Sequence, residues 1–150
     1  MSDMLELCLF PLDALRLAVR VTDVVQVVPY QPLTPVPLAP PMVVGLMNLR
    51  GEIVAGVDLR RQFGLGEHDP SRDPMNVVLQ SLAGPVSLIV DDQVEVVHVD
   101  ADDFEPVPET LPQRIRQFIE AACTVEDGLV LLLDVEKSVD VAHHLIESSP

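Results

Sequence analysis

The stretch Gly45-Leu-Met-Asn-Leu-Arg-Gly51, which continues as Glu52-Ile-Val-Ala-Gly-Val-Asp58, indicates two short apolar strands that reverse direction around a glycine. Asn48 and Arg50 interrupt the first strand, and such side chains are costly to bury unless a partner satisfies them. Residues two apart in a strand point to the same face, so we expect Asn48 and Arg50 to share one side. That side belongs either to a surface for another protein or to an internal network in which Arg50 joins two halves through a carboxylate.

Around this hairpin the chain carries a series of short apolar runs bounded by turn residues. The run that ends at Asp58 is followed by a basic helical turn that stops at Gly64, and Gly128 to Asp134 repeats that layout. About ten strands of this kind are typical of two small β-barrels packed side by side, each too small to be stable without the other. The remaining predicted strands cover residues 5–10, 15–21, 24–28, 76–79, 86–90, 93–99 and 124–126.

Four segments are predicted to lie outside the strands. Residues 29–41 hold six of the fourteen prolines, which excludes helix and favours an ordered connector over a proline-rich ligand for an aromatic groove. The polar residues 67–74 form a surface loop or the boundary between two halves. Residues 112–122 form an amphipathic helix, or a helix that runs into a strand at Ile119. Asp134 is expected to cap a closing helix that continues through residues 139–146.

Size and charge narrow the functional classes. The 150 residues suit a single domain over residues 1–150. The net charge is −15, and one of the nine basic residues is a lysine. Nucleic acid and anionic membranes are therefore poor partners, because phosphate-binding surfaces need clustered Lys and Arg. The acidity serves solubility or steers the protein toward a basic partner. The start of the chain lacks the pattern of a signal peptide, and no run approaches membrane-span length, so we expect a soluble cytoplasmic protein.

A search for reactive groups gives no catalytic residue, cofactor or metal site. The sequence has no phosphate-binding glycine loop and no Cys or His spacing typical of zinc. Asp91-Asp92 and Asp102-Asp103 lack the spaced ligands of a calcium loop, so a solvated acidic face is favoured. Cys8 and Cys123 are expected to be reduced, buried and inert, although folding could bring a base to one of them. An enzyme built from scattered carboxylates remains the rival interpretation, with a deep pocket as its mark.

Several motifs together resemble one known family, the CheW-like domains of bacterial chemotaxis. The similarity rests on Gly45 to Arg60, with its Asn-Leu-Arg-Gly and Val-Asp-Leu-Arg motifs, supported by Val24-Val25-Gln26-Val27 and the proline-rich connector. Ser87 to Val97 and Leu129 to Lys137 also fit. The resemblance covers roughly residues 4 to 140.

The resemblance implies a mostly β fold of two SH3-like five-stranded barrels with short helices, and a non-enzymatic adaptor. It implies that a CheA-type histidine kinase binds through its CheW-like regulatory domain, and that the cytoplasmic tip of a chemoreceptor packs into a groove between the barrels. An adaptor of pilus motility or of another CheA-type pathway is the alternative, and a module that only assembles with other CheW-like domains is a third reading. The implied protein-binding residues are Asn48, Arg50, Gln26, Val24, Val27 and Leu46.

One of these positions departs from the family pattern. Family members often carry Glu where Gln26 stands, and that Glu can pair with the arginine. A glutamine can still donate to or accept from a neighbour, but it has no charge to offer Arg50. We therefore expect Arg50 to be more available to a partner's carboxylate.

Overall fold

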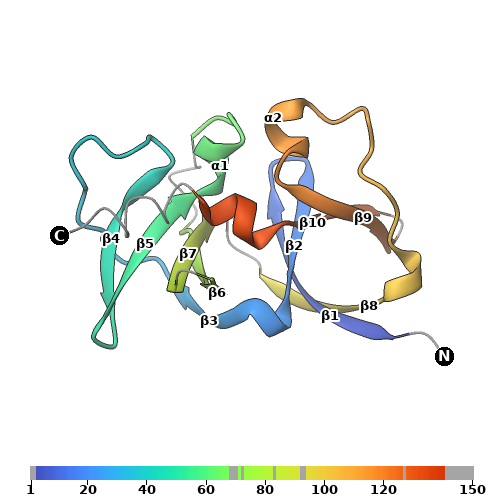
Figure 1. Cartoon of the computed structure of the whole chain (residues 1–150), viewed down its shortest axis with the longest axis horizontal. Coiled ribbons are helices and arrows are strands. Elements are labelled where there is room, and N and C mark those ends of the chain that lie inside the picture. The colour runs from blue at the N-terminus through green and yellow to red at the C-terminus, as the bar shows by residue number, and fades with distance from the viewer. Residues whose placement is uncertain are drawn as a thin grey trace.

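Two five-stranded sheets make up the structure, which is a computed structural model that describes residues 3–67, 71, 73–82, 84–91, 94–126 and 128–140. Each sheet curves on itself as a small barrel, and the barrels lie side by side along the long axis (Figure 1). This confirms the predicted mostly β class with two five-stranded units. Barrel A has the strand order β8 (Glu95–Asp100), β1 (Met4–Leu12), β2 (Leu15–Arg20), β10 (Gly128–Leu133) and β9 (Ile119–Val125). Barrel B has the order β3 (Val24–Pro29), β6 (Met75–Ser81), β7 (Gly84–Val90), β5 (Glu52–Asp58) and β4 (Val43–Leu49).

The two barrels repeat one topology. In each, two antiparallel hairpins are joined by a parallel pair, β2 with β10 in barrel A and β7 with β5 in barrel B. The predicted repeat of a strand, an aspartate and a helical turn is also present. Asp58 Oδ1 accepts a hydrogen bond from the backbone N of Arg60 at 2.9 Å, and Asp134 Oδ1 accepts one from the backbone N of Lys137 at 3.1 Å. Each aspartate thus caps a short helix that follows its strand.

The chain does not divide into two halves. Barrel B is contiguous, whereas barrel A combines the first hairpin, β1–β2, with the last three strands, and β8 pairs with β1. The interpretation of residues 67–74 as a boundary between halves is therefore wrong, because they lie between α1 (Leu59–Gln62) and β6, inside barrel B. Local polarity does not show where the barrels divide, because strand pairing between distant segments decides it.

The other predictions from local patterns are resolved as follows. Residues 29–41 form a connector, in which Thr34 exchanges two backbone hydrogen bonds of 2.8 Å with Leu46. Gly45 permits this approach, since a Cβ there would lie 2.5 Å from the Thr34 carbonyl oxygen. The segment 112–122 follows its second alternative, with α2 (Gln113–Arg116) running into β9 at Ile119. Residues 135–140 are helical, while Asp127 and the predicted continuation to residue 146 lie outside the described residues.

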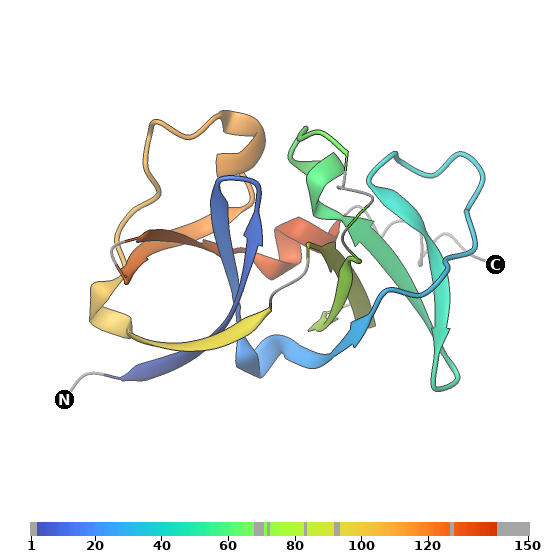
Figure 2. The same cartoon turned by 180° about the vertical axis from the view of Figure 1, so that it is seen from behind.

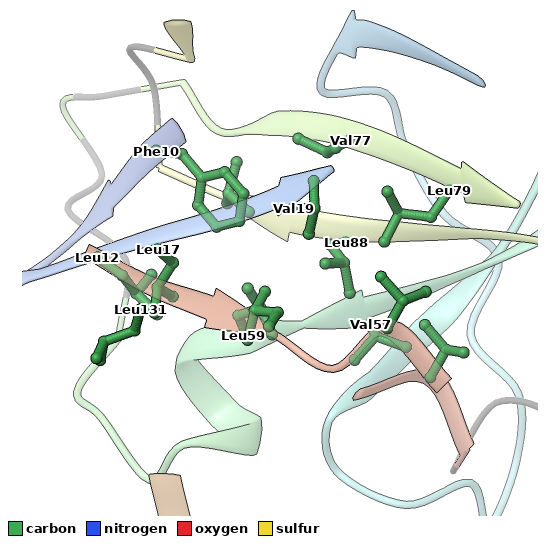
Figure 3. Packing of buried hydrophobic residues seen from close by; sticks show 14 of the residues in the cluster. Phe10, Leu12, Leu17, Val19, Val57, Leu59, Val77, Leu79, Leu88 and Leu131 are labelled. Carbon is green, nitrogen blue, oxygen red and sulfur yellow. The ribbon is translucent and has the colours of Figure 1, made fainter. Parts of the chain in front are cut away.

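One apolar core joins the two barrels, because side chains on one face of each sheet point toward the other sheet. Figure 3 shows Phe10 and Leu17 of barrel A packed with Leu79 and Leu88 of barrel B, all fully buried. The opposite faces of the sheets enclose two smaller clusters, one around Leu7 in barrel A and one around Met47, Val54 and Val78 in barrel B. Burial of apolar surface between the sheets is the main force that holds the barrels together.

Candidate functional site

The β4–β5 hairpin places Asn48 and Arg50 differently from the prediction. β4 ends at Leu49, and the next two residues, Arg50 and Gly51, have φ angles of 53° and 87°. Two positive φ angles define a type I′ turn, so Arg50 lies in the turn and not in the strand. Asn48 Oδ1 accepts a hydrogen bond from the backbone N of Gly51 at 3.0 Å, which stabilises the turn. The expectation that Asn48 and Arg50 share one strand face is therefore wrong.

Arg50 is exposed at the tip of this hairpin. Its guanidinium makes no hydrogen bond or ion pair with any described residue. In the described part of the chain it therefore does not act as an internal staple between the halves. A guanidinium held out on a rigid two-residue turn is available to a carboxylate of another molecule.

Three of the predicted apolar residues lie on one face of barrel B. Val24 and Val27 of β3 pair with Leu79 and Val77, and Leu46 of β4 pairs with Ala55. These three partner residues belong to the shared core. Because paired residues in antiparallel strands share a face, Val24, Val27 and Leu46 point to the side on which barrel A packs. Val24 and Leu46 are half-buried against the core, while Val27 is 37% exposed.

Gln26 points the other way. It pairs with Val78, which belongs to the separate cluster inside barrel B. Within the described residues the Gln26 side chain makes no hydrogen bond to Arg50. Gln26 thus lies on an edge strand and Arg50 at a hairpin tip. The two residues that the resemblance implied as a pair make no direct contact in this structure.

Barrel A presents a matching face. Cys8 of β1 lies in the shared core and pairs with Val96 of β8, which is 56% exposed, and the next pairs outward are Glu6 with His98 and Met4 with Asp100. β1, β8, η1 (Val21–Asp23), β3 and the β4–β5 turn follow the lower border of the molecule in Figure 1 and again from behind in Figure 2. We call the accessible residues of these two sheet faces the open face. It comprises Met4, Glu6, Val96, His98 and the half-buried Asp100 of barrel A, and Val27, Asn48, Ile53 and the half-buried Val24 and Leu46 of barrel B.

The opposite border is closed by polar and aromatic contacts between the barrels. Phe63, after α1, stacks on Phe118, after α2, with ring centroids 5.9 Å apart, and Arg114 Nε donates to the Phe63 carbonyl at 3.0 Å. The α1 and α2 helices lie next to each other at the top of Figure 1. The barrels are therefore fastened along one border and leave apolar side chains exposed along the other.

Arg60 also joins the two barrels, through ion pairs. Its Nη2 lies 2.7 Å from Asp13 Oδ1 in the β1–β2 turn of barrel A, and its Nη1 lies 3.1 Å from Asp91 Oδ2 at the end of β7 in barrel B. Its Nε donates to the carbonyl of Gly66 at 2.6 Å. Burial lowers the pKa of Arg60, but its hydrogen bonds and the charges of Asp13 and Asp91 outweigh this and raise the pKa above its ordinary value.

This contact corrects one prediction and supplies a residue that sequence reasoning missed. Asp91 is not part of a solvated acidic face, because its side chain is 14% exposed and pairs with Arg60; Asp92 lies outside the described residues. Arg60 was read only as part of a basic helical turn, since neither carboxylate partner is near it in sequence. The aspartate cap before the turn was the one available local signal.

The described cavity beside α1 was the place to look for converging carboxylates. A cavity of about 380 Å³ beside α1 is lined by Tyr30, Asp58, Asp73 and Asp91 among others. Asp58 caps α1 and Asp91 pairs with Arg60, so two of these three carboxylates are engaged in the fold. No cluster of three or more His, Cys, Asp or Glu side chains suited to a metal ion occurs among the described residues.

Both cysteines are buried and free of disulfide bonds. Burial raises the pKa of the Cys8 thiol, and burial together with the negative charge of Asp103 raises that of Cys123. Since the thiolate is the reactive form, we expect neither thiol to react with a disulfide reagent in the native protein within minutes at pH 8. Both should react at once in denaturant. Rapid labelling of one native thiol would revive the catalytic-cysteine interpretation.

None of the helices in the described segments has the length and apolar character that a membrane crossing requires.

Comparison with known proteins agrees with this architecture. The sequence profile of the CheW-like domain matches residues 6–143. The chain is 27% identical over 131 residues to the chemotaxis protein CheW of Rhizobium meliloti (strain 1021), covering 87% of this chain and 84% of that protein. It is 26% identical over 135 residues to the chemotaxis protein CheW of Bacillus subtilis (strain 168), covering 90% and 86%. The crystal structure of the scaffolding protein TtCheW from Thermoanaerobacter tengcongensis has a TM-score of 0.80 and 27% identity, covering 90% of this chain and 87% of that one. The chain belongs to the CheW-like domain family.

Proposed function

We propose that the protein is a non-enzymatic adaptor that links a CheA-type histidine kinase to the cytoplasmic tips of chemoreceptors, and that it works in the cytoplasm. Family membership and the scaffold architecture support this role. The observation that carries the proposal is the open face, where apolar side chains of both barrels remain exposed next to a continuous core. An apolar face bordered by polar residues is the usual form of a protein interface.

In this proposal the receptor tip packs on the open face. Val24, Val27 and Leu46 supply the apolar contact from barrel B, and Arg50 anchors a receptor carboxylate from the hairpin tip. Asn48 holds the turn that presents Arg50, through its bond to the Gly51 amide. Gln26 acts from the neighbouring edge strand. The kinase's regulatory domain, or another CheW-like domain, occupies a separate barrel surface, so that both partners bind at once.

We expect Arg50→Glu to fold like the native protein and to lose binding to the receptor tip. The reversed charge repels the carboxylate that Arg50 would meet, whereas no described contact within the chain is lost. The measurement is co-sedimentation of the kinase with vesicles that display receptor cytoplasmic fragments, with and without the adaptor.

Lys137→Glu is the control, because it makes the same change of charge at an exposed residue of the closing helix. It should sediment the kinase as well as the native protein does. Undiminished bridging by a folded Arg50→Glu variant would remove Arg50 from the site. Failure of the native protein to bridge any kinase to any receptor fragment of its own organism would contradict the proposed function itself.

A further inference from the structure

We propose that the helix that docks on the open face carries basic side chains where it crosses barrel A and an acidic side chain where it meets Arg50. The inference rests on the proposed function and names the charge pattern, and hence the direction, of the partner. It follows from how the charges of this chain are distributed along the open face.

The apolar part of the open face lies between its charged ends. On barrel A the face runs outward from buried Cys8 to exposed Val96, and on barrel B it runs from half-buried Val24 to Val27, which is partly exposed. Both rows continue the shared core without a polar break. An amphipathic helix that lays its apolar stripe on these valines would extend the core at this border.

The barrel A end of the open face is negative. Glu6 and Asp100 follow Val96 outward on the same face. Among the described residues, the Glu6 carboxylate lies next to His98, and His98 Nε2 is 3.6 Å from Glu6 Oε2. Asp100 Oδ1 accepts only a backbone hydrogen bond, from Asp102 N at 2.9 Å.

Arg20 does not offset these charges. Arg20, at the end of β2, donates to both carboxylate oxygens of Glu120, at 3.0 Å and 2.7 Å. That bidentate pair raises the pKa of Arg20 and lowers the pKa of Glu120, each chiefly through the hydrogen bonds between them. Arg20 is therefore already matched to a carboxylate of its own barrel.

The barrel B end carries a positive charge at its hairpin tip. Arg50 projects from the β4–β5 turn next to Asn48 and Ile53, which pair with each other on the face that continues the shared core. Glu52 is the nearest acid in sequence, but it pairs with Leu49, whose side chain packs on the opposite face against the inner cluster of barrel B. Arg50 is thus the charge that a partner meets at this end.

Opposite charges at the two ends give a docked helix one preferred direction. A partner that places Lys or Arg beside Glu6 and Asp100 and a carboxylate beside Arg50 gains at both ends, and the reversed helix loses at both. The net charge of −15 adds a general attraction for a basic partner. The local pattern, and not the net charge, selects the direction.

The test compares two double variants that remove the same charge. Glu6→Gln with Asp100→Asn neutralises the barrel A end, and asparagine keeps the helix-cap hydrogen bond of Asp100. Glu109→Gln with Glu126→Gln neutralises two exposed acids that are not part of the open face. The probes are the receptor tip fragments of the same organism, prepared as soluble helical hairpins. Association rates are measured at pH 8, from about 50 to about 300 mM salt.

We expect the native protein to bind one or more tips faster at low salt. The first double variant should associate about tenfold more slowly at low salt and converge with the native protein at high salt, and the second should stay within about twofold. Equal rates for the native protein and the first variant, or equal losses in both variants, would overturn the charge pattern while the adaptor role stands. No binding of any tip by the native protein would overturn both.

Discussion

Replacing Arg60 with alanine should lower the free energy of unfolding by about 3 kcal/mol, near the bottom of the range for breaking a buried ion pair. The loss is large because the change removes the guanidinium that faces the nearly buried Asp91 and releases the one described ion pair that reaches from α1 to barrel A. It is not larger because Asp13 is half exposed, and water takes over part of the stabilisation of its charge. Urea denaturation followed by circular dichroism measures the change.

The neighbouring Arg61 provides a matched control. Its side chain is half exposed, donates to the Pro41 carbonyl at 3.1 Å and lies 3.7 Å from Asp58. Arg61→Ala should cost less than about 1 kcal/mol. Arg60→Lys should fall between the two alanine variants, because an ammonium keeps the charge but cannot reach Asp13, Asp91 and the Gly66 carbonyl together. Equal costs for Arg60→Ala and Arg61→Ala would show that the staple contributes little.

Truncation of Phe10 to alanine should cost about 4 kcal/mol, as expected when a fully buried phenylalanine leaves a cavity. Phe10 belongs to barrel A but packs in the core that both barrels share. We therefore propose that residues 1–150 fold as a single domain, and that damage to one barrel melts the other with it. The midpoint of thermal unfolding should fall by about 10 °C for a chain of this size.

The sequence itself supplies a reporter for this coupling. It contains no tryptophan and one tyrosine, Tyr30, which follows β3 of barrel B. In Phe10→Ala, the tyrosine fluorescence and the far-ultraviolet circular dichroism should shift to the same lower temperature. Leu82→Ala, at a residue that is 92% exposed, should leave both signals within a degree or two. A tyrosine transition that stays at its native temperature while circular dichroism loses amplitude earlier would mean that the barrels unfold separately.

Local patterns were sufficient to predict most strands and the helix caps at Asp58 and Asp134. Alternating apolar residues, turn glycines and the aspartates at 58 and 134 are signals that act within a few residues. The pairing of β8 with β1 links residues about ninety positions apart, and no periodicity in either strand encodes its partner. The division of the barrels was therefore not predictable from local features.

The two arginines show the same limit at the candidate site. The sequence pattern places Arg50 inside an apolar strand. The Arg-Gly pair instead forms a turn, because Gly51 readily adopts the positive φ angle that the turn requires. Arg60 was overlooked because basic residues in a helical turn are usually solvated. Its burial depends on carboxylates 47 and 31 positions away, which only the folded chain brings to it.

The interleaved order of the strands has a consequence for biosynthesis. All of barrel B has left the ribosome once residue 90 is exposed, whereas the β1–β2 hairpin, made first, lacks β10 until residue 133 has emerged. At an elongation rate of about 5–20 residues per second, the hairpin waits for seconds before β10, which pairs with Leu17 and Ala18, is translated. The leading hairpin is the segment most in need of a holdase chaperone, and slow codons between β7 and β10 would lengthen that exposure.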